Sequence, residues 1–304
     1  MRWLNVAITM PWLQLHFLTD PEHASAIEDA LLEIGAAAVT FQDNEDQPIL
    51  EPALGETPLW KATRVTGLFD ANVDTAGISE NVAKQLDMDI SNSQWEQLED
   101  KDWQREWMSH YRPIPCGPNL WVCPSWCEPP EPEAVNILLD PGLAFGTGTH
   151  PTTLQCLQWL ADQDMADLTV CDYGCGSGIL GIAALLMGAR SMNGVDIDPQ
   201  ALIATRDNAN RNQIDESKVS TFLPKGFKPS LHDIVFANIL AGPLVELAPT
   251  LTSLTKPGGK LCLSGILDSQ AQAVMDAYQD EFEFEPIREL DHWVQLAATR
   301  RTTN

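Results

Sequence analysis

Two glycine-rich stretches and two polar residues carry the candidate chemistry of this 304-residue chain. The stretches are residues 139–153 (LDPGLAFGTGTHPTT) and 172–178 (DYGCGSG), and the polar residues are Asp196 and Asn238. The second stretch follows an apolar predicted strand and precedes a predicted helix over about residues 179–187. A glycine turn in that setting exposes backbone N–H groups and lets a ligand approach the main chain closely. We interpret the four features as one nucleotide-type cofactor pocket, in which Asp196 accepts the hydroxyls of a ribose.

Two cofactors fit a turn of this kind. Gly176, Gly178 and Gly181 match the dinucleotide pattern G-x-G-x-x-G, so the spacing permits NAD and an oxidoreductase. Asp172 and Gly174 extend the pattern to D-x-G-x-G-x-G. The extended pattern resembles the first motif of S-adenosylmethionine-dependent methyltransferases, in which the acid helps to position the methionine part of the cofactor. We therefore favour S-adenosylmethionine and keep NAD as the alternative.

Five segments closely resemble the bacterial ribosomal protein methyltransferase family called PrmA, whose members methylate the eleventh protein of the large ribosomal subunit. They read LDPGLAFGTGTHPTT, CDYGCGSGIL, GVDIDPQAL, FANILAGPLVELAP and LSGIL. The resemblance extends from Met10 to about Trp293, nearly the whole chain. It implies methyl transfer from S-adenosylmethionine to lysine side-chain amines and the N-terminal α-amine of a basic large-subunit ribosomal protein.

The resemblance also implies roles for single residues. Thr153 and Gly174 match positions that contact the cofactor in the family, and Asp196 matches the acid that binds the ribose. Asn238 matches the residue between the cofactor and the target amine, so it is the expected catalytic residue and a cofactor contact. No metal site is expected.

Further cofactor contacts are expected in both glycine-rich stretches. Asp172 and Gly176 belong to the glycine turn. Phe145, Gly146 and Thr147 are expected to close over the cofactor, which the glycines around them allow.

The residues after Asn238 indicate the kind of acceptor. The run N-I-L-A resembles the N-P-P-Y motif of amine and amide methyltransferases, but Ile239 and Leu240 replace the prolines and Ala241 replaces the aromatic residue that clamps planar groups. An alkyl amine, which needs room to rotate, suits this site better than an adenine or an amide. His150 could serve as a base, although a structural role in the loop is the interpretation we favour.

Composition limits the partners. The net charge is −25, and residues 1–100 hold 18 acidic against 4 basic side chains. This charge argues against direct nucleic-acid binding and favours encounter with a basic protein. The alternative is that the acidic side chains form a solvated surface with no binding role. The seven scattered cysteines include no C-x-x-C pair, so we expect reduced, buried thiols instead of zinc or disulfides.

The predicted fold is α/β. A seven-stranded Rossmann-like class I methyltransferase domain (residues 119–304) follows a small ferredoxin-like α+β domain for substrate recognition (1–92), and a linker helix and crossing (93–118) joins them. In the first domain we expect strands over 12–18, 37–42 and 61–69 and helices over 20–34 and 78–86, with a linker helix over 95–111. In the second we expect helices over 179–187 and 199–212, strands over 168–171, 192–195, 219–223, 233–237 and 260–264, and a closing hairpin of 282–290 with 293–298.

No run of residues reaches the roughly 18 apolar positions of a membrane span. We expect a cytoplasmic monomer that binds no membrane. The nine residues before Met10 lie outside the resemblance, as a misassigned start codon would explain. Two further alternatives stay open: a methyltransferase for another basic protein or a small amine, and a cofactor-binding regulatory module without turnover.

Overall fold

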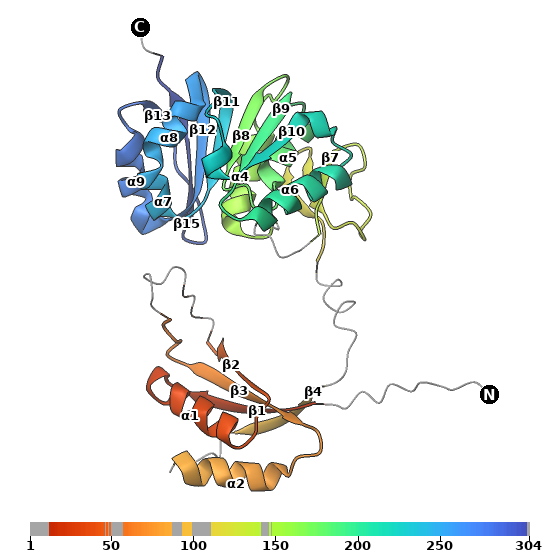
Figure 1. Cartoon of the computed structure of the whole chain (residues 1–304), viewed down its shortest axis with the longest axis vertical. Helices are drawn as coiled ribbons and strands as arrows, with labels where there is room; N and C mark the ends of the chain where they lie inside the picture. Colours follow the sequence, from red (N-terminus) through yellow and green to blue (C-terminus); the bar gives the residue numbers. More distant parts are fainter. Residues whose placement is uncertain are drawn as a thin grey trace, which may run out of the picture. The chain divides into compact units, whose positions relative to one another are not determined.

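The computed structural model describes residues 12–45, 47, 49, 57–86, 93–98, 111–140, 146 and 148–302. The chain forms two compact units, residues 1–108 and 109–304, each with a sheet and a core of its own (Figure 1). No helix in these ranges is long and apolar enough to pass through a bilayer.

The first unit is a four-stranded antiparallel sheet with strand order β2-β3-β1-β4 and two helices. Its elements are β1 (Trp12–Thr19), α1 (Pro21–Glu33), β2 (Ala38–Asp43), β3 (Thr63–Asp70), α2 (Thr75–Leu86) and β4 (Gln94–Leu98). The predicted elements up to residue 86 are confirmed. Alternate residues of β1, such as Leu15 and Phe17, pack with Ile27 and Leu31 of α1, because the period of a strand turns every second side chain toward the helices.

Strand β4 contradicts the predicted helix from Trp95 over residues 95–98. Trp95 pairs in register with Leu15, its ring packs 5.4 Å from that of Phe69, and its Nε1 donates a hydrogen bond to Ser79 Oγ at 2.9 Å. The packing of this partly buried ring against the core favours the strand over the local helical pattern. The remainder of the predicted helix up to residue 110 lies outside the described residues.

The second unit is an α/β fold around a mixed sheet with strand order β10-β9-β8-β11-β12-β15-β13, and β14 pairs with β15. The strands are β8 (Thr169–Tyr173), β9 (Ser191–Val195), β10 (Val219–Phe222), β11 (His232–Asn238), β12 (Thr255–Leu267), β13 (Phe282–Phe284), β14 (Arg288–Leu290) and β15 (Trp293–Arg300). The first five are parallel, and β15 runs antiparallel between β12 and β13. The α/β class is therefore as predicted. The described sheet has an eighth strand, because the segment predicted as one strand over 282–290 is divided into β13 and β14.

The order of the strands indicates where this sheet would bind a ligand. From β8 the chain proceeds outward through β9 to β10, whereas β11 continues in the opposite direction to β12. Open α/β sheets bind ligands at the carboxyl ends of the strands where the order reverses. Here that point lies between β8 and β11, which end at Tyr173 and Asn238.

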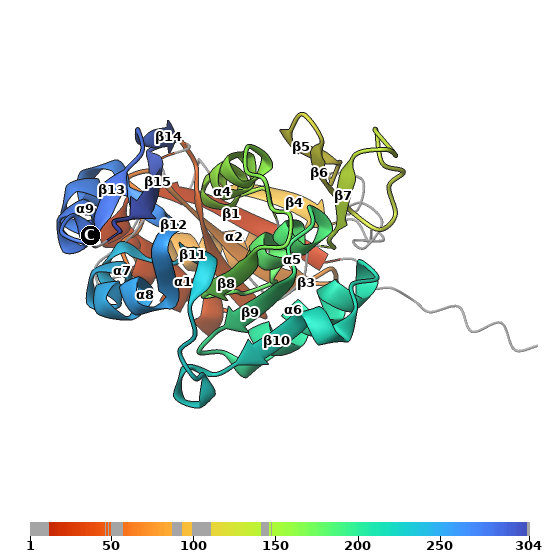
Figure 2. The same ribbon diagram turned by 90° about the horizontal axis from the view of Figure 1, so that it is seen from above.

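Helices cover both faces of this sheet (Figure 2). One face carries α4 (Pro151–Ala161), α5 (Ile179–Leu186) and α6 (Pro199–Arg211), and the other carries α7 (Ala241–Glu246), α8 (Ala248–Leu254) and α9 (Ala271–Tyr278). Successive residues of β11 alternate between the two cores: Ile234 and Phe236 pack with α4 and α5, Val235 and Ala237 with α7 and α8.

Two features of this unit are absent from the prediction. Three short strands, β5 (Ile114–Gly117), β6 (Leu120–Cys123) and β7 (Val135–Leu138), form a separate sheet that contacts α4 and α5. Helix α4 begins at Pro151, so Pro151 to Thr153 belong to a helix and not to the end of the long loop. His150 is the N-cap of that helix.

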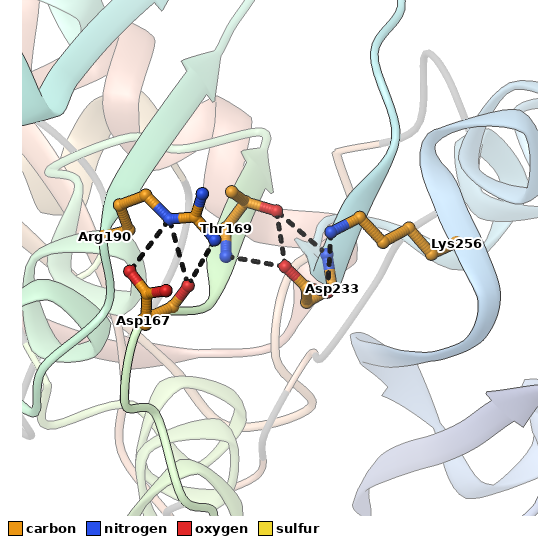
Figure 3. Close-up of polar contacts among 5 residues, drawn as sticks. All are labelled: Asp167, Thr169, Arg190, Asp233 and Lys256. Atoms are coloured by element: carbon orange, nitrogen blue, oxygen red, sulfur yellow. Dashed lines mark hydrogen bonds and ion pairs between the residues drawn. The ribbon is translucent and has the colours of Figure 1, made fainter.

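A polar network ties the amino ends of the central strands together, at the edge opposite the crevice (Figure 3). Asp233 accepts hydrogen bonds from the backbone N–H and the hydroxyl of Thr169, at 2.9 and 2.7 Å, and from Lys256 Nζ at 2.7 Å. Beside it, Arg190 pairs with the carboxylate of Asp167 at 3.0 Å. The network therefore joins β8, β11 and β12 away from the candidate site.

Candidate cofactor and amine site

Asp172 lies near the carboxyl end of β8, and its side chain is enclosed. The residue is 2% exposed, and its Oδ2 accepts the backbone N–H of Gly181 at 3.1 Å. Burial raises the pKa of Asp172 to about 7, the hydrogen bond from Gly181 partly offsets this, and the nearby charge of Asp196 raises it further. A positive charge brought beside Asp172 would stabilise its carboxylate form.

Asp196 follows β9 and is oriented by the main chain. Its Oδ2 accepts the N–H of Gly176 at 2.9 Å, and its Oδ1 accepts the N–H of Asp198 at 2.9 Å. Each carboxylate oxygen keeps a further acceptor position. The predicted ribose acid is thus held against the glycine turn, where it can accept two vicinal hydroxyls.

Gly174 brings the glycine turn against the segment after β11. Its φ of 80° is in the left-handed region, and a Cβ added there would lie 2.3 Å from Cγ2 of Ile239. Only glycine meets both conditions without a shift of the backbone. The turn and the residue after Asn238 therefore form one continuous wall.

Asn238 and Thr153 are in direct contact. Asn238 Nδ2 donates a hydrogen bond to Thr153 Oγ1 at 3.2 Å, which joins the end of β11 to the first turn of α4. Because the amide nitrogen is engaged, the amide oxygen is oriented away from Thr153. No described residue donates to that oxygen, so it can accept an N–H from a substrate.

His150 supports the structural interpretation. Its Nδ1 caps α4 by accepting the N–H of Thr152, and its ring packs edge-on against Trp293 with centroids 5.1 Å apart. Burial lowers the pKa of His150. The ring is therefore occupied with holding the start of α4.

Of the three residues expected to close over the cofactor, Gly146 is described, whereas Phe145 and Thr147 lie outside the described residues. Gly146 O accepts a hydrogen bond from Ser177 Oγ at 2.7 Å. The long loop and the glycine turn therefore meet directly.

Two further side chains complete the geometry. Ile197, which sequence reasoning missed, is 84% exposed immediately after Asp196, where it offers an apolar surface to a planar base. Its signal in the sequence is an apolar residue between two acids. Cys175 is buried, burial raises the pKa of its thiol to about 12, and its Sγ lies 3.4 Å from Thr205 Oγ1. It fills space and is not activated as a nucleophile.

The residues present fit S-adenosylmethionine. Asp196 suits its ribose, Ile197 its adenine, and the enclosed carboxyl of Asp172 its charged amino acid part. At Gly174 the missing side chain leaves room for Ile239, which holds the glycine turn against the end of β11.

The chain is similar to known proteins over nearly its whole length. The family model described as "Ribosomal protein L11 methyltransferase (PrmA)" matches residues 11–301. The ribosomal protein L11 methyltransferase of Cellvibrio japonicus is 60% identical over 291 residues, which cover 96% of this chain and 99% of the relative. That of Teredinibacter turnerae is 56% identical over 292 residues, covering 96% and 98%. A crystal structure of ribosomal protein L11 methylase from Lactobacillus delbrueckii subsp. bulgaricus has a TM-score of 0.58 and 32% identity, and covers 63% of this chain and 100% of that chain.

Proposed function

The chain belongs to the ribosomal protein L11 methyltransferase (PrmA) family, and from that premise we propose that it methylates lysine side-chain amines and the N-terminal α-amine of ribosomal protein L11. S-adenosylmethionine is the methyl donor of this methyltransferase. The names of the relatives support L11 as the protein substrate. The net charge of −25 supports a basic partner, since opposite charges accelerate encounter.

Asn238 carries the proposal for an amine acceptor. It stands at the carboxyl end of β11 with its amide nitrogen bonded to Thr153, which leaves the amide oxygen to accept a hydrogen bond. Ala241 replaces the aromatic clamp of amide and adenine methyltransferases, and the lack of that clamp supports an alkyl amine as the acceptor.

The bound cofactor supplies a methyl group on a positively charged sulfur. Asn238 Oδ1 accepts an N–H of the neutral amine and orients the nitrogen lone pair toward that methyl carbon. When bound, S-adenosylmethionine would supply the electrophilic methyl group, and Asn238 would hold the amine that accepts it. Burial of the amine next to a cation lowers the pKa of its ammonium form, so its proton can be lost to water before transfer.

We further assign the first unit as a ferredoxin-like domain that recognises the substrate, and residues 119–304 as the methyltransferase domain. Because β4 (Gln94–Leu98) pairs with β1, we place it in the first domain and not in the expected connection over residues 93–118. The β-α-β-β-α-β order of its described elements and its antiparallel order β2-β3-β1-β4 support the assignment. Its acidic composition supports contact with a basic protein. A ribosomal protein substrate also favours the cytoplasm as the location of this enzyme.

The test is methyl transfer from labelled S-adenosylmethionine to purified L11, followed by mass spectrometry of its lysines and N-terminus. We expect several methylated amines, and loss of transfer in Asn238→Ala and Asp196→Ala. The exposed Asn210 and Asp207 give matched controls, Asn210→Ala and Asp207→Ala, which should retain transfer. Cofactor binding without transfer to L11 would contradict the substrate, and the same assay on other basic proteins and small amines would then identify the acceptor.

A further inference from the structure

Helix α6 presents polar side chains to the carbonyl groups of the glycine turn. Thr205 Oγ1 donates a hydrogen bond to Gly176 O at 3.1 Å, and Asn208 Nδ2 donates to Ser177 O at 2.9 Å. The two side chains are three positions apart and so share one face of the helix. Thr205 is fully buried and Asn208 is 8% exposed.

The end of the same helix holds the start of the long loop. Asn212, the C-cap of α6, forms two hydrogen bonds with the backbone of Leu138: it accepts the N–H at 2.8 Å and donates to the carbonyl at 2.9 Å. Leu138 is the last residue of β7, directly before residues 139–153. Arg211 lies 3.5 Å from the carboxylate of Asp140 in that loop.

The two attachments are linked to each other. Arg211 Nη1 donates a hydrogen bond to Asn208 Oδ1 at 2.9 Å, and Asn212 Nδ2 also donates to Asn208 O at 2.8 Å. A single rigid helix therefore fixes both cofactor-binding segments, although 31 residues separate Ser177 from Asn208 and 74 separate Leu138 from Asn212.

The attachment also orients the glycine turn. The C=O of Gly176 and the N–H of Ser177 belong to one planar trans peptide and point in opposite directions. A carbonyl held by Thr205 therefore directs the N–H of Ser177 away from α6. Backbone N–H groups directed outward are what a glycine turn offers to a ligand.

We infer that Thr205, Asn208, Arg211 and Asn212, here called the α6 bracket, are positioning residues that set the spacing of the two cofactor-binding segments and thereby the affinity for the cofactor. The inference rests on the S-adenosylmethionine site used in the proposed function. It deepens that function by assigning the geometry of the binding site to side chains that hold the backbone of Gly176, Ser177 and Leu138.

The experiment is calorimetric titration of the full-length protein with S-adenosylhomocysteine. Asn208→Ala and Asn212→Ala should each weaken binding about tenfold, the effect of about one lost hydrogen bond to the backbone of the cofactor-binding segments. Asn210→Ala, an exposed asparagine on the same helix, should remain within about twofold of wild type. At saturating cofactor, kcat and the KM for the protein substrate should change little, since the bracket touches neither amine nor Asn238.

Hydrogen exchange gives a second readout without cofactor. The amide of Leu138 should exchange faster in Asn212→Ala than in Asn208→Ala, because only Asn212 accepts its N–H. The inference would be overturned if both bracket variants bound S-adenosylhomocysteine as tightly as wild type. It would also be overturned if the loss of binding in each variant equalled the fraction of protein that thermal melts show to be unfolded. Failure of the wild type itself to bind S-adenosylhomocysteine would instead overturn the cofactor site of the proposed function.

Discussion

The carbonyl of Ile239 is packed against Gly265 of β12. Gly265 has a φ of 81°, and a Cβ added there would lie 2.3 Å from Ile239 O. Ile239 also continues the strand ladder through its N–H, which donates to Ser264 O at 3.1 Å. The position of the segment after Asn238 is therefore fixed by the absence of one side chain on the neighbouring strand.

Gly265→Ala should displace Asn238 and reduce methyl transfer about 100-fold, the effect of a shift of about 1 Å at a reacting centre. Overpacking should also cost about 1–3 kcal/mol of stability. Single-turnover transfer and urea unfolding measure the two effects. Gly242→Ala is the control, because a Cβ there meets nothing within 4 Å; equal activity of the two variants would contradict the role of Gly265.

Asp196→Asn should weaken S-adenosylhomocysteine binding about 10- to 100-fold. The amide has the same shape as the carboxylate, but one of its two ends cannot accept the hydrogen bonds that Gly176, Asp198 and a ribose donate. Calorimetry checks the affinity, with the exposed Asp207→Asn as the matched variant. An Asp196→Asn protein that binds as tightly as wild type would remove Asp196 from the site.

Cofactor affinity should rise with pH between about 5.5 and 8. The pKa of Asp172 is raised to about 7 in the free protein, so below this value the carboxyl is protonated, and binding the ammonium group of S-adenosylhomocysteine must release the proton. Below pH 7 the affinity should rise by nearly tenfold per pH unit, and above pH 7 it should no longer change with pH. Asp172→Asn should flatten the profile; a wild-type affinity that is independent of pH would contradict this account.

The same shift affects stability. The raised pKa of Asp172 gives a contribution to stability that is fully present below the ordinary carboxyl pKa of 3.8 and is lost as the pH rises through about 7. Asp172→Asn should therefore raise the thermal midpoint of the cofactor-free protein at pH 8 and change it less at pH 5. Calorimetric melts at the two pH values provide the comparison.

The network at the opposite edge has the reverse pH dependence. Burial acts to raise the pKa of Asp233, but the hydrogen bonds from Lys256 and Thr169 outweigh it and lower the pKa to about 2. Its contribution is present above pH 3.8 and is lost as the pH falls toward 2. Lys256→Met should cost about 1 kcal/mol at pH 7, a value that allows for partial solvent exposure, and less at pH 3.

Urea unfolding at the two pH values checks this, with the exposed Lys218→Met as control. Cofactor affinity of Lys256→Met should equal that of wild type, since the network lies at the amino ends of the strands. A loss of affinity without loss of stability would contradict the separation of the two edges.

The sequence predicted those helices and turns that depend on residues close together in the chain. The helix after Asp198 and the turn over 172–178 were predicted from a cap, a proline and a glycine spacing, and both are formed within a few residues. Helix α4 also begins with a proline, but it is buried on nearly every side, so no exposed polar face marked it as a helix in the sequence. Strand β4 is formed by the burial of Trp95 against Phe69, a contact between distant residues.

The candidate site shows the same division. Asp196 and Asn238 could be placed because each follows a strand, and the ends of parallel strands meet at one edge. The α6 bracket could not, because the pairing of Asn212 with Leu138 depends on the folded distance between them and not on any spacing in the chain.

The place of β15 has a consequence for synthesis of the protein. Residues 293–300 pair with β12 on one side and with β13 and β14 on the other, so they are an interior strand of the sheet. A nascent chain that has not yet emerged to residue 300 leaves the edges of β12 and β13 unpaired, and such edges are sites of aggregation. Completion of the catalytic sheet therefore has to await the emergence of residues 293–300 from the ribosome.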